Sequence, residues 1–78
     1  MNISEIKKEL NRYDKNRVIK YLQIKSGNES DDLDRLINTI IKKKKIKNTD
    51  EFLMRLNISA YTFMTAPQRE KYMHNILL

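Results

Sequence analysis

The residues with the clearest chemical potential are lysines in the middle of the chain. Lys42, Lys43, Lys44 and Lys45 are consecutive, and Lys47 follows after a single isoleucine. Ammonium groups in such a run bind phosphate oxygens, and each neutralised phosphate adds to the salt dependence of binding. Phosphate contacts supply affinity but carry no sequence information. The alternative interpretation is a helix end that faces water, where the lysines only complement the helix dipole.

No other group of residues has the spacing of a catalytic or metal site. His74 is the only histidine and cysteine is absent, which excludes histidine-rich and thiolate metal sites. Asp31, Asp32 and Asp34 lack the glycine and the terminal glutamate of a calcium loop, and they suit the first turn of a helix. Helical spacing places no acid or nucleophile beside His74. We therefore expect no cofactor and no enzymatic activity.

The composition describes a small basic protein. The 78 residues include 16 Lys or Arg and 10 Asp or Glu, which gives a formal net charge of +6. A chain of this length, residues 1–78, forms one domain with a thin core that gains stability from a partner or a second copy. We expect a homodimer. The charge favours anionic partners, with nucleic acid first.

The source and the location of the protein are also suggested by composition. The first residues, MNISEIKKEL, are charged and lack the apolar segment of a signal peptide. The longest apolar run is too short to span a membrane. These features predict a cytoplasmic protein with no membrane partner. Isoleucine, lysine and asparagine are abundant and have AT-rich codons, so we expect a low-GC bacterium, its phages or a mobile element.

Apolar residues recur at helical spacing along nearly the whole chain, and the alternation typical of strands is missing. The pattern predicts an all-α fold, a compact bundle of five or six short helices with a helix-turn-helix-like unit in the C-terminal half. The first two helices are either separate or one bent helix. The expected helices cover residues 5–12, 14–25, 31–45, 50–56, 60–65 and the segment from 66 onward.

Polar residues, glycine and proline predict where these helices begin and end. Asp14 and Ser30 are expected N-caps, and Gly27 is the expected left-handed stop between the second and third helices. Thr65 opens the last helix as part of a capping box, with Pro67 in the first turn.

Residues 50–63 resemble the helix-turn-helix motif of small DNA-binding regulators of phages and mobile elements. In that family an apolar first helix ends in a turn residue, and a branched apolar residue, a cap and a second helix follow. The matching residues are the core positions Phe52, Leu53 and Leu56, the turn residue Asn57, the buried residue Ile58 and the cap Ser59.

The resemblance implies that the second helix enters the major groove of DNA. The protein would then be a DNA-binding transcription regulator, acting as a dimer on two half-sites, with the lysines of residues 42–47 on phosphates. The contacts expected from the motif itself are Ser59, Ala60, Tyr61, Thr62, Met64 and Thr65.

The chemistry of this outward face also suggests a different partner. It has no Arg, Lys, Gln or Asn to read base edges, and its larger side chains suit a protein groove better. The alternative function is therefore a non-enzymatic protein-binding modulator or inhibitor of a transcription or host-defence factor. A helical hairpin without a binding role is a further interpretation. The expected protein interface consists of Met54, Tyr61, Met64, Tyr72, Ile76, Leu77 and Leu78.

Overall fold

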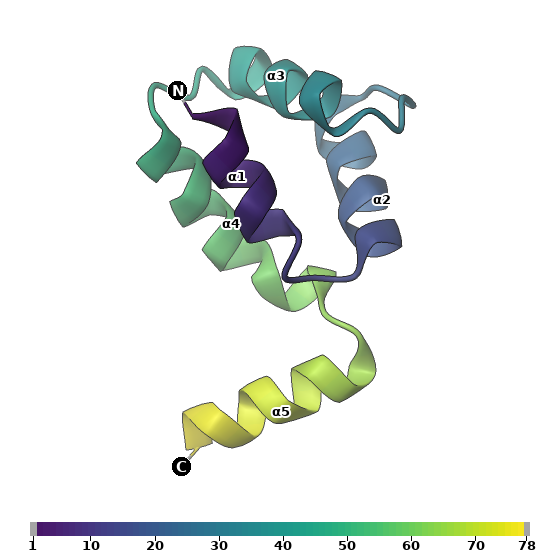
Figure 1. Cartoon of the computed structure of the whole chain (residues 1–78), viewed down its shortest axis with the longest axis vertical. Helices are drawn as coiled ribbons and strands as arrows, with labels where there is room; N and C mark the ends of the chain where they lie inside the picture. Colours follow the sequence, from purple (N-terminus) through teal and green to yellow (C-terminus); the bar gives the residue numbers. More distant parts are fainter. Residues whose placement is uncertain (1, 78) are drawn as a thin grey trace.

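The apolar spacing and the capping residues produce a purely helical chain. The computed structural model describes the backbone of residues 2–77 and the side chains of residues 2–75. Within this part of the chain there are five helices and no strand, which confirms the predicted all-α class. None of these helices is long and apolar enough to cross a membrane. The helices are α1 (Ile3–Leu10), α2 (Lys15–Ser26), α3 (Leu33–Lys44), α4 (Thr49–Phe63) and α5 (Ala66–Leu77) (Figure 1).

Local side-chain chemistry sets the ends of α2 and the start of α3. Asp14 accepts a backbone N–H at the start of α2, and Gly27, with a φ of 70°, ends that helix as predicted. The cap of α3 differs from the prediction. Asp32 takes this role instead of Ser30, because Ser30 accepts the N–H of Asp32 and so organises the preceding loop. The structure also shows that α1 and α2 are separate helices, joined by a short turn.

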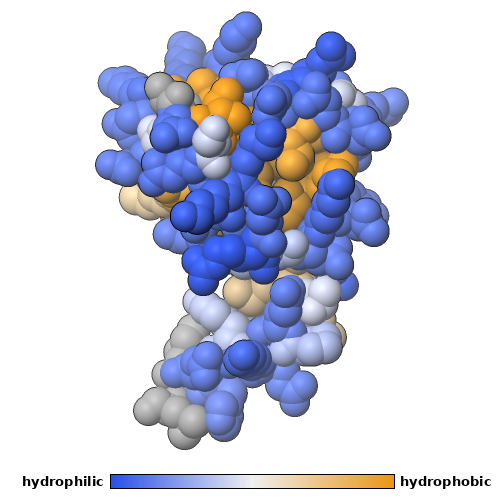
Figure 2. Space-filling view, viewed as in Figure 1, coloured by the Kyte–Doolittle hydropathy of each residue, from blue (hydrophilic) through white to orange (hydrophobic). Residues whose placement is uncertain are grey.

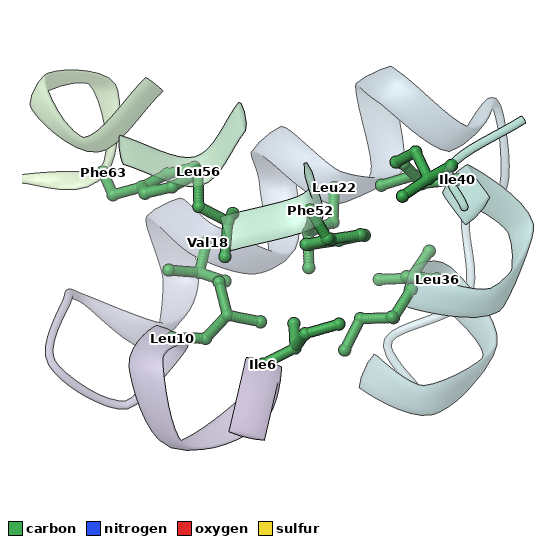
Figure 3. Packing of buried hydrophobic residues seen from close by; sticks show 11 residues of the cluster. Ile6, Leu10, Val18, Leu22, Leu36, Ile40, Phe52, Leu56 and Phe63 are labelled. Carbon is green, nitrogen blue, oxygen red and sulfur yellow. The ribbon is translucent and has the colours of Figure 1, made fainter. Parts of the chain in front are cut away.

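One apolar core joins the first four helices. α2 packs most extensively against α3, and α4 packs against both α1 and α2. In Figure 1, α3 crosses one end of the group formed by α1, α2 and α4. Figure 3 shows the core side chains pointing toward one another: Ile6, Leu10, Val18, Leu22, Leu36, Ile40, Phe52, Leu56 and Phe63.

The fifth helix, α5, lies apart from this core. Figure 1 shows α5 beyond the other four helices, joined to α4 by a short link, and it packs closely against none of them. The Oγ1 of Thr65 accepts the N–H of Gln68, and the side chain of Gln68 accepts the N–H of Thr65, so the predicted capping box is confirmed. The guanidinium of Arg69 lies 5.6 Å from the ring centre of Tyr61 and ties the start of α5 to α4.

The predicted helix-turn-helix unit at residues 50–63 is wrong, because α4 passes through it without interruption. Asn57, Ile58 and Ser59, expected to be the turn, the buried residue and the cap, are all inside this helix. Among the described residues, positive φ angles occur only outside α4. Asn57 therefore does not adopt the left-handed conformation that the turn requires.

The physical reason is a buried stripe that continues across the expected turn. Phe52, Leu56, Ala60 and Phe63 recur at helical spacing and are all buried. A turn at Asn57 would move the last two residues off this stripe. The preference of asparagine for turns is weak by comparison, since asparagine in a helix costs less than about 0.7 kcal/mol relative to alanine.

Substitutions at Asn57 distinguish the continuous helix from a turn. In a helix interior, alanine is more stable than glycine by about 1 kcal/mol. We therefore expect the Asn57→Ala variant to resist urea denaturation better than Asn57→Gly by about this amount. A left-handed turn would give the opposite order, because only glycine adopts that conformation without cost.

Candidate functional site

The outer side of α4 carries a second row of apolar side chains. Met54, Ile58 and Tyr61 follow the spacing i, i+4, i+7, which places them on one face of the helix. Their exposed fractions are 58%, 79% and 48%. This face, called the outer stripe below, lies opposite the buried stripe. α4 is therefore apolar on two sides, and the described residues bury only one of them.

A cleft lies beside the outer stripe, between α2, the end of α3 and α4, and is called the α2–α4 cleft below. Its volume is about 250 Å³. Most of its apolar residues belong to the core, whereas Ile58 is shared with the outer stripe. The apolar lining consists of Leu22, Ile40, Ile46, Phe52, Leu56 and Ile58.

Three cations surround this cleft and form what we call the cationic rim. Lys25 comes from α2, Lys44 from the last turn of α3 and Arg55 from α4, and no acidic residue lines the cleft. The ammonium of Lys25 lies 5.5 Å from the ring centre of Tyr21. Within the described part of the chain, neither rim lysine has an ion-pair partner. Their positive charge is therefore available to a ligand.

Arg55 is the rim cation whose charge is partly compensated. One carboxylate oxygen of Glu51 lies 3.6 Å from its guanidinium. The other oxygen accepts the backbone N–H of Lys47 at 2.9 Å. This hydrogen bond first, and then the charge of Arg55, lower the pKa of Glu51 below its ordinary value. Glu51 therefore stays ionised at neutral pH and holds Arg55 at the edge of the cleft.

A hydrogen bond fixes the wall of the cleft where α2 meets α4. The hydroxyl oxygens of Tyr21 and Ser59 are 2.6 Å apart. The Tyr21 ring also packs edge-on against the ring of Phe63, with ring centres 4.7 Å apart. Ser59 therefore connects two helices and does not cap one, as the sequence had suggested.

The lysines predicted to bind phosphate surround the end of α3. Lys45 has a φ of 54°, and the next N–H, that of Ile46, donates to the carbonyl of Ile41 at 3.0 Å. This left-handed turn directs Ile46 into the core and stops the helix. Only Lys44 of this group lines the cleft. All of the predicted phosphate-binding lysines are exposed: Lys42, Lys43, Lys44, Lys45 and Lys47.

Two predicted contact residues are buried, and this corrects the sequence interpretation. Ala60 and Met64 each have an exposed fraction of 8%. The sequence prediction places both on an outward face because it begins a new helix near residue 60. The single helix α4 turns Ala60 toward the core instead, and Met64 follows at its C-terminal cap. Neither residue is available to DNA or to a protein partner.

The other predicted contact residues differ in accessibility. Tyr61, Thr62 and Tyr72 are exposed, and Thr65 is half-buried where it caps α5. The side chains of Ile76 and Leu77, together with all of Leu78, lie outside the described residues.

Sequence reasoning missed Ile58, Lys25 and Arg55 as site residues. Ile58 could have been identified from the sequence, because it completes the row of Met54 and Tyr61 when the helical period is continued through Asn57. The sequence contains no comparable signal for Lys25 and Arg55, since they come from different helices and meet only after folding.

Comparison with protein-family models, with curated proteins and with solved structures finds no match to this chain. The described residues include no group of three or more His, Asp or Glu side chains that could hold a metal ion. The outer stripe, the α2–α4 cleft and the charges around them are the surface features suited to binding.

The Tyr21–Ser59 contact can be measured by a double-mutant cycle. We expect Tyr21→Phe and Ser59→Ala each to lower the free energy of unfolding by about 0.5–1.5 kcal/mol, because each removes one hydrogen-bond partner. The double variant should cost less than the sum of the two by about 0.5 kcal/mol or more, as expected for a direct contact. Urea denaturation measures all four proteins, and strictly additive costs would show that the pair is not coupled.

Proposed function

We propose that this chain is a non-enzymatic protein-binding modulator that docks its partner on the outer face of α4. The observation that supports this most directly is the outer stripe. Met54, Ile58 and Tyr61 present three large side chains in a row on a rigid helix whose opposite side is held by the core. A partner helix or groove is recognised by anchors at this spacing.

The exposure of these side chains indicates how a partner would gain affinity. Fully burying a side chain of the size of isoleucine or methionine is favourable by about 1.5–3 kcal/mol. Ile58 is the most exposed large apolar residue of the chain part that the structure describes, so it has the most to gain. Tyr61 adds an aromatic ring with a polar tip, a type of residue enriched at the energetic centres of interfaces.

Figure 2 shows the distribution of apolar and hydrophilic residues on one face of the molecule. It is mostly hydrophilic, with apolar residues reaching the surface in patches on the larger part of the molecule. Single exposed apolar residues are normal on protein surfaces, whereas a continuous apolar row is associated with binding. Met54, Ile58 and Tyr61 form such a row on α4.

Replacing Ile58 separates binding from folding. We expect Ile58→Gln to change the free energy of unfolding by less than about 0.5 kcal/mol, because the residue is exposed. The same change should weaken binding of helical peptides, selected from a random displayed library on the native chain, by about tenfold or more. Fluorescence anisotropy measures the peptide Kd, and circular dichroism measures unfolding.

The matched control is Ile24→Gln, which removes another well-exposed isoleucine, from α2, without changing the outer stripe or the cleft lining. Equal loss of peptide binding in both variants would contradict docking on α4. Failure of the library to yield any peptide that binds the native chain would also contradict it.

A second candidate function is binding of a nucleic-acid backbone by the lysines at the end of α3. The observation that favours it is that all of these lysines are exposed, and in the described structure none forms an ion pair. Such binding would use phosphates alone and would not select a base sequence. It requires no recognition helix, so it does not depend on the motif that α4 replaces.

A salt titration with mixed-sequence duplex DNA tests this candidate. If the lysines bind phosphates, affinity should fall steeply between about 50 and 200 mM salt. Lys43→Glu together with Lys44→Glu should weaken binding equally for all DNA sequences. Absence of binding at low salt would mean that these lysines only terminate α3 in water.

A further inference from the structure

The cleft beside α4 combines an apolar floor with positive charge. Its floor consists of core side chains, including Leu22, Phe52 and Leu56, whereas all the charged residues that line it are cations. The volume of about 250 Å³ lies below the range of about 300–1,000 Å³ typical of pockets for drug-sized ligands. A single large apolar side chain suits this space better than a whole cofactor.

The charges around the cleft determine what should surround that side chain. Lys25 and Lys44 have no ion-pair partner in the described structure, and Arg55 shares its charge with Glu51. Like charges around one cleft repel one another, and carboxylates placed among them remove this repulsion and add attraction. Phosphates would satisfy the rim equally well, but a nucleic-acid backbone has nothing apolar to place in the cleft. An acidic polypeptide supplies both groups.

We propose that the α2–α4 cleft binds an acidic amphipathic helix of a partner protein. One apolar side chain of that helix enters the cleft, its neighbours one turn away cover Ile58, and its carboxylates pair with Lys25, Lys44 and Arg55. This inference rests on the proposed docking function of α4 and adds the chemical class of the partner. The cationic rim supplies selectivity, because it attracts an acidic helix and repels a basic one.

A second copy of the chain is a poorer occupant than an external partner. The most acidic segment of this chain is the start of α3, where Asp31, Asp32 and Asp34 are exposed. Two of these aspartates already have partners, since Asp32 caps α3 and Asp34 pairs with Lys7 at 3.1 Å. The apolar residue among them, Leu33, packs against its own core and is not free to act as an anchor.

The test begins with a library of random helical peptides selected on the native full-length chain. Enriched peptides should be acidic and should carry apolar residues at positions i and i+4. Lys25→Glu combined with Lys44→Glu should weaken their binding by about tenfold or more, measured as the Kd by fluorescence anisotropy. The control is Lys15→Glu combined with Lys20→Glu, which changes the net charge by the same amount at exposed lysines outside the cleft lining. Circular dichroism verifies that both double variants fold.

The outcomes separate this inference from the proposed function. Enrichment of neutral or basic peptides, or equal weakening by both double variants, would overturn the acidic partner while docking on α4 remained supported by Ile58→Gln. Loss of all peptide binding on addition of duplex DNA, with DNA binding lost in Lys25→Glu alone, would assign the cleft to nucleic acid. Sedimentation as a dimer that the rim variant dissociates would assign it to a second copy. If neither Ile58→Gln nor the rim variant weakened binding, both proposals would be wrong.

Discussion

The packing of one side of α4 against the other helices is the interaction on which the rest of the structure depends. Phe63 is fully buried and meets the rings of Tyr13 and Tyr21, which come from the α1–α2 turn and from α2. Phe52 and Leu56 extend the same contact toward α3 (Figure 3). The remaining core helices are short, and isolated helices shorter than about 12–15 residues are marginal in water. Their stability therefore depends on packing against one another, as α2 does against α3, and on the apolar surface that α4 supplies to α1 and α2.

This packing also determines which residues α4 presents to solvent. A helix whose inner residues are fixed cannot rotate, so the residues on the opposite side must face outward. Met54, Ile58 and Tyr61 are exposed for this reason and not because the local chain is irregular. Helix α5 packs closely against none of the core helices and reaches the outer stripe at Tyr61, over which Arg69 lies, so Met54 and Ile58 remain exposed. A small domain buries a smaller fraction of its surface than a large one, which fits a helix that is buried on one side.

Local chemistry made much of the fold predictable. The helix ends are set by groups that are close together in the sequence. Asp14, Gly27 and Thr65 each act on backbone groups only a few residues away, so their effects can be predicted from the sequence. The continuity of α4 could not be predicted in the same way. It depends on whether the weak turn preference of Asn57 is outweighed by packing against residues that are distant along the chain. The cleft was still less accessible to prediction. Tyr21 and Ser59 are far apart in sequence, and no periodic pattern indicates their contact.

The basic residues differ in position, so they would contribute differently to the affinity and to the selectivity of partner binding. Most of the basic side chains are exposed to water, where dissolved salt screens their charge over about 8–10 Å. Lys44 differs from its neighbours because it lines a partly apolar cleft together with Lys25 and Arg55. A carboxylate held there loses water on the side that faces the cleft floor, and charge interactions strengthen as water is excluded. Apolar contact of the partner with Ile58 would exclude water from the cleft. This exclusion would strengthen the charge interactions that make the rim selective, so the stripe and the cleft would act as one surface.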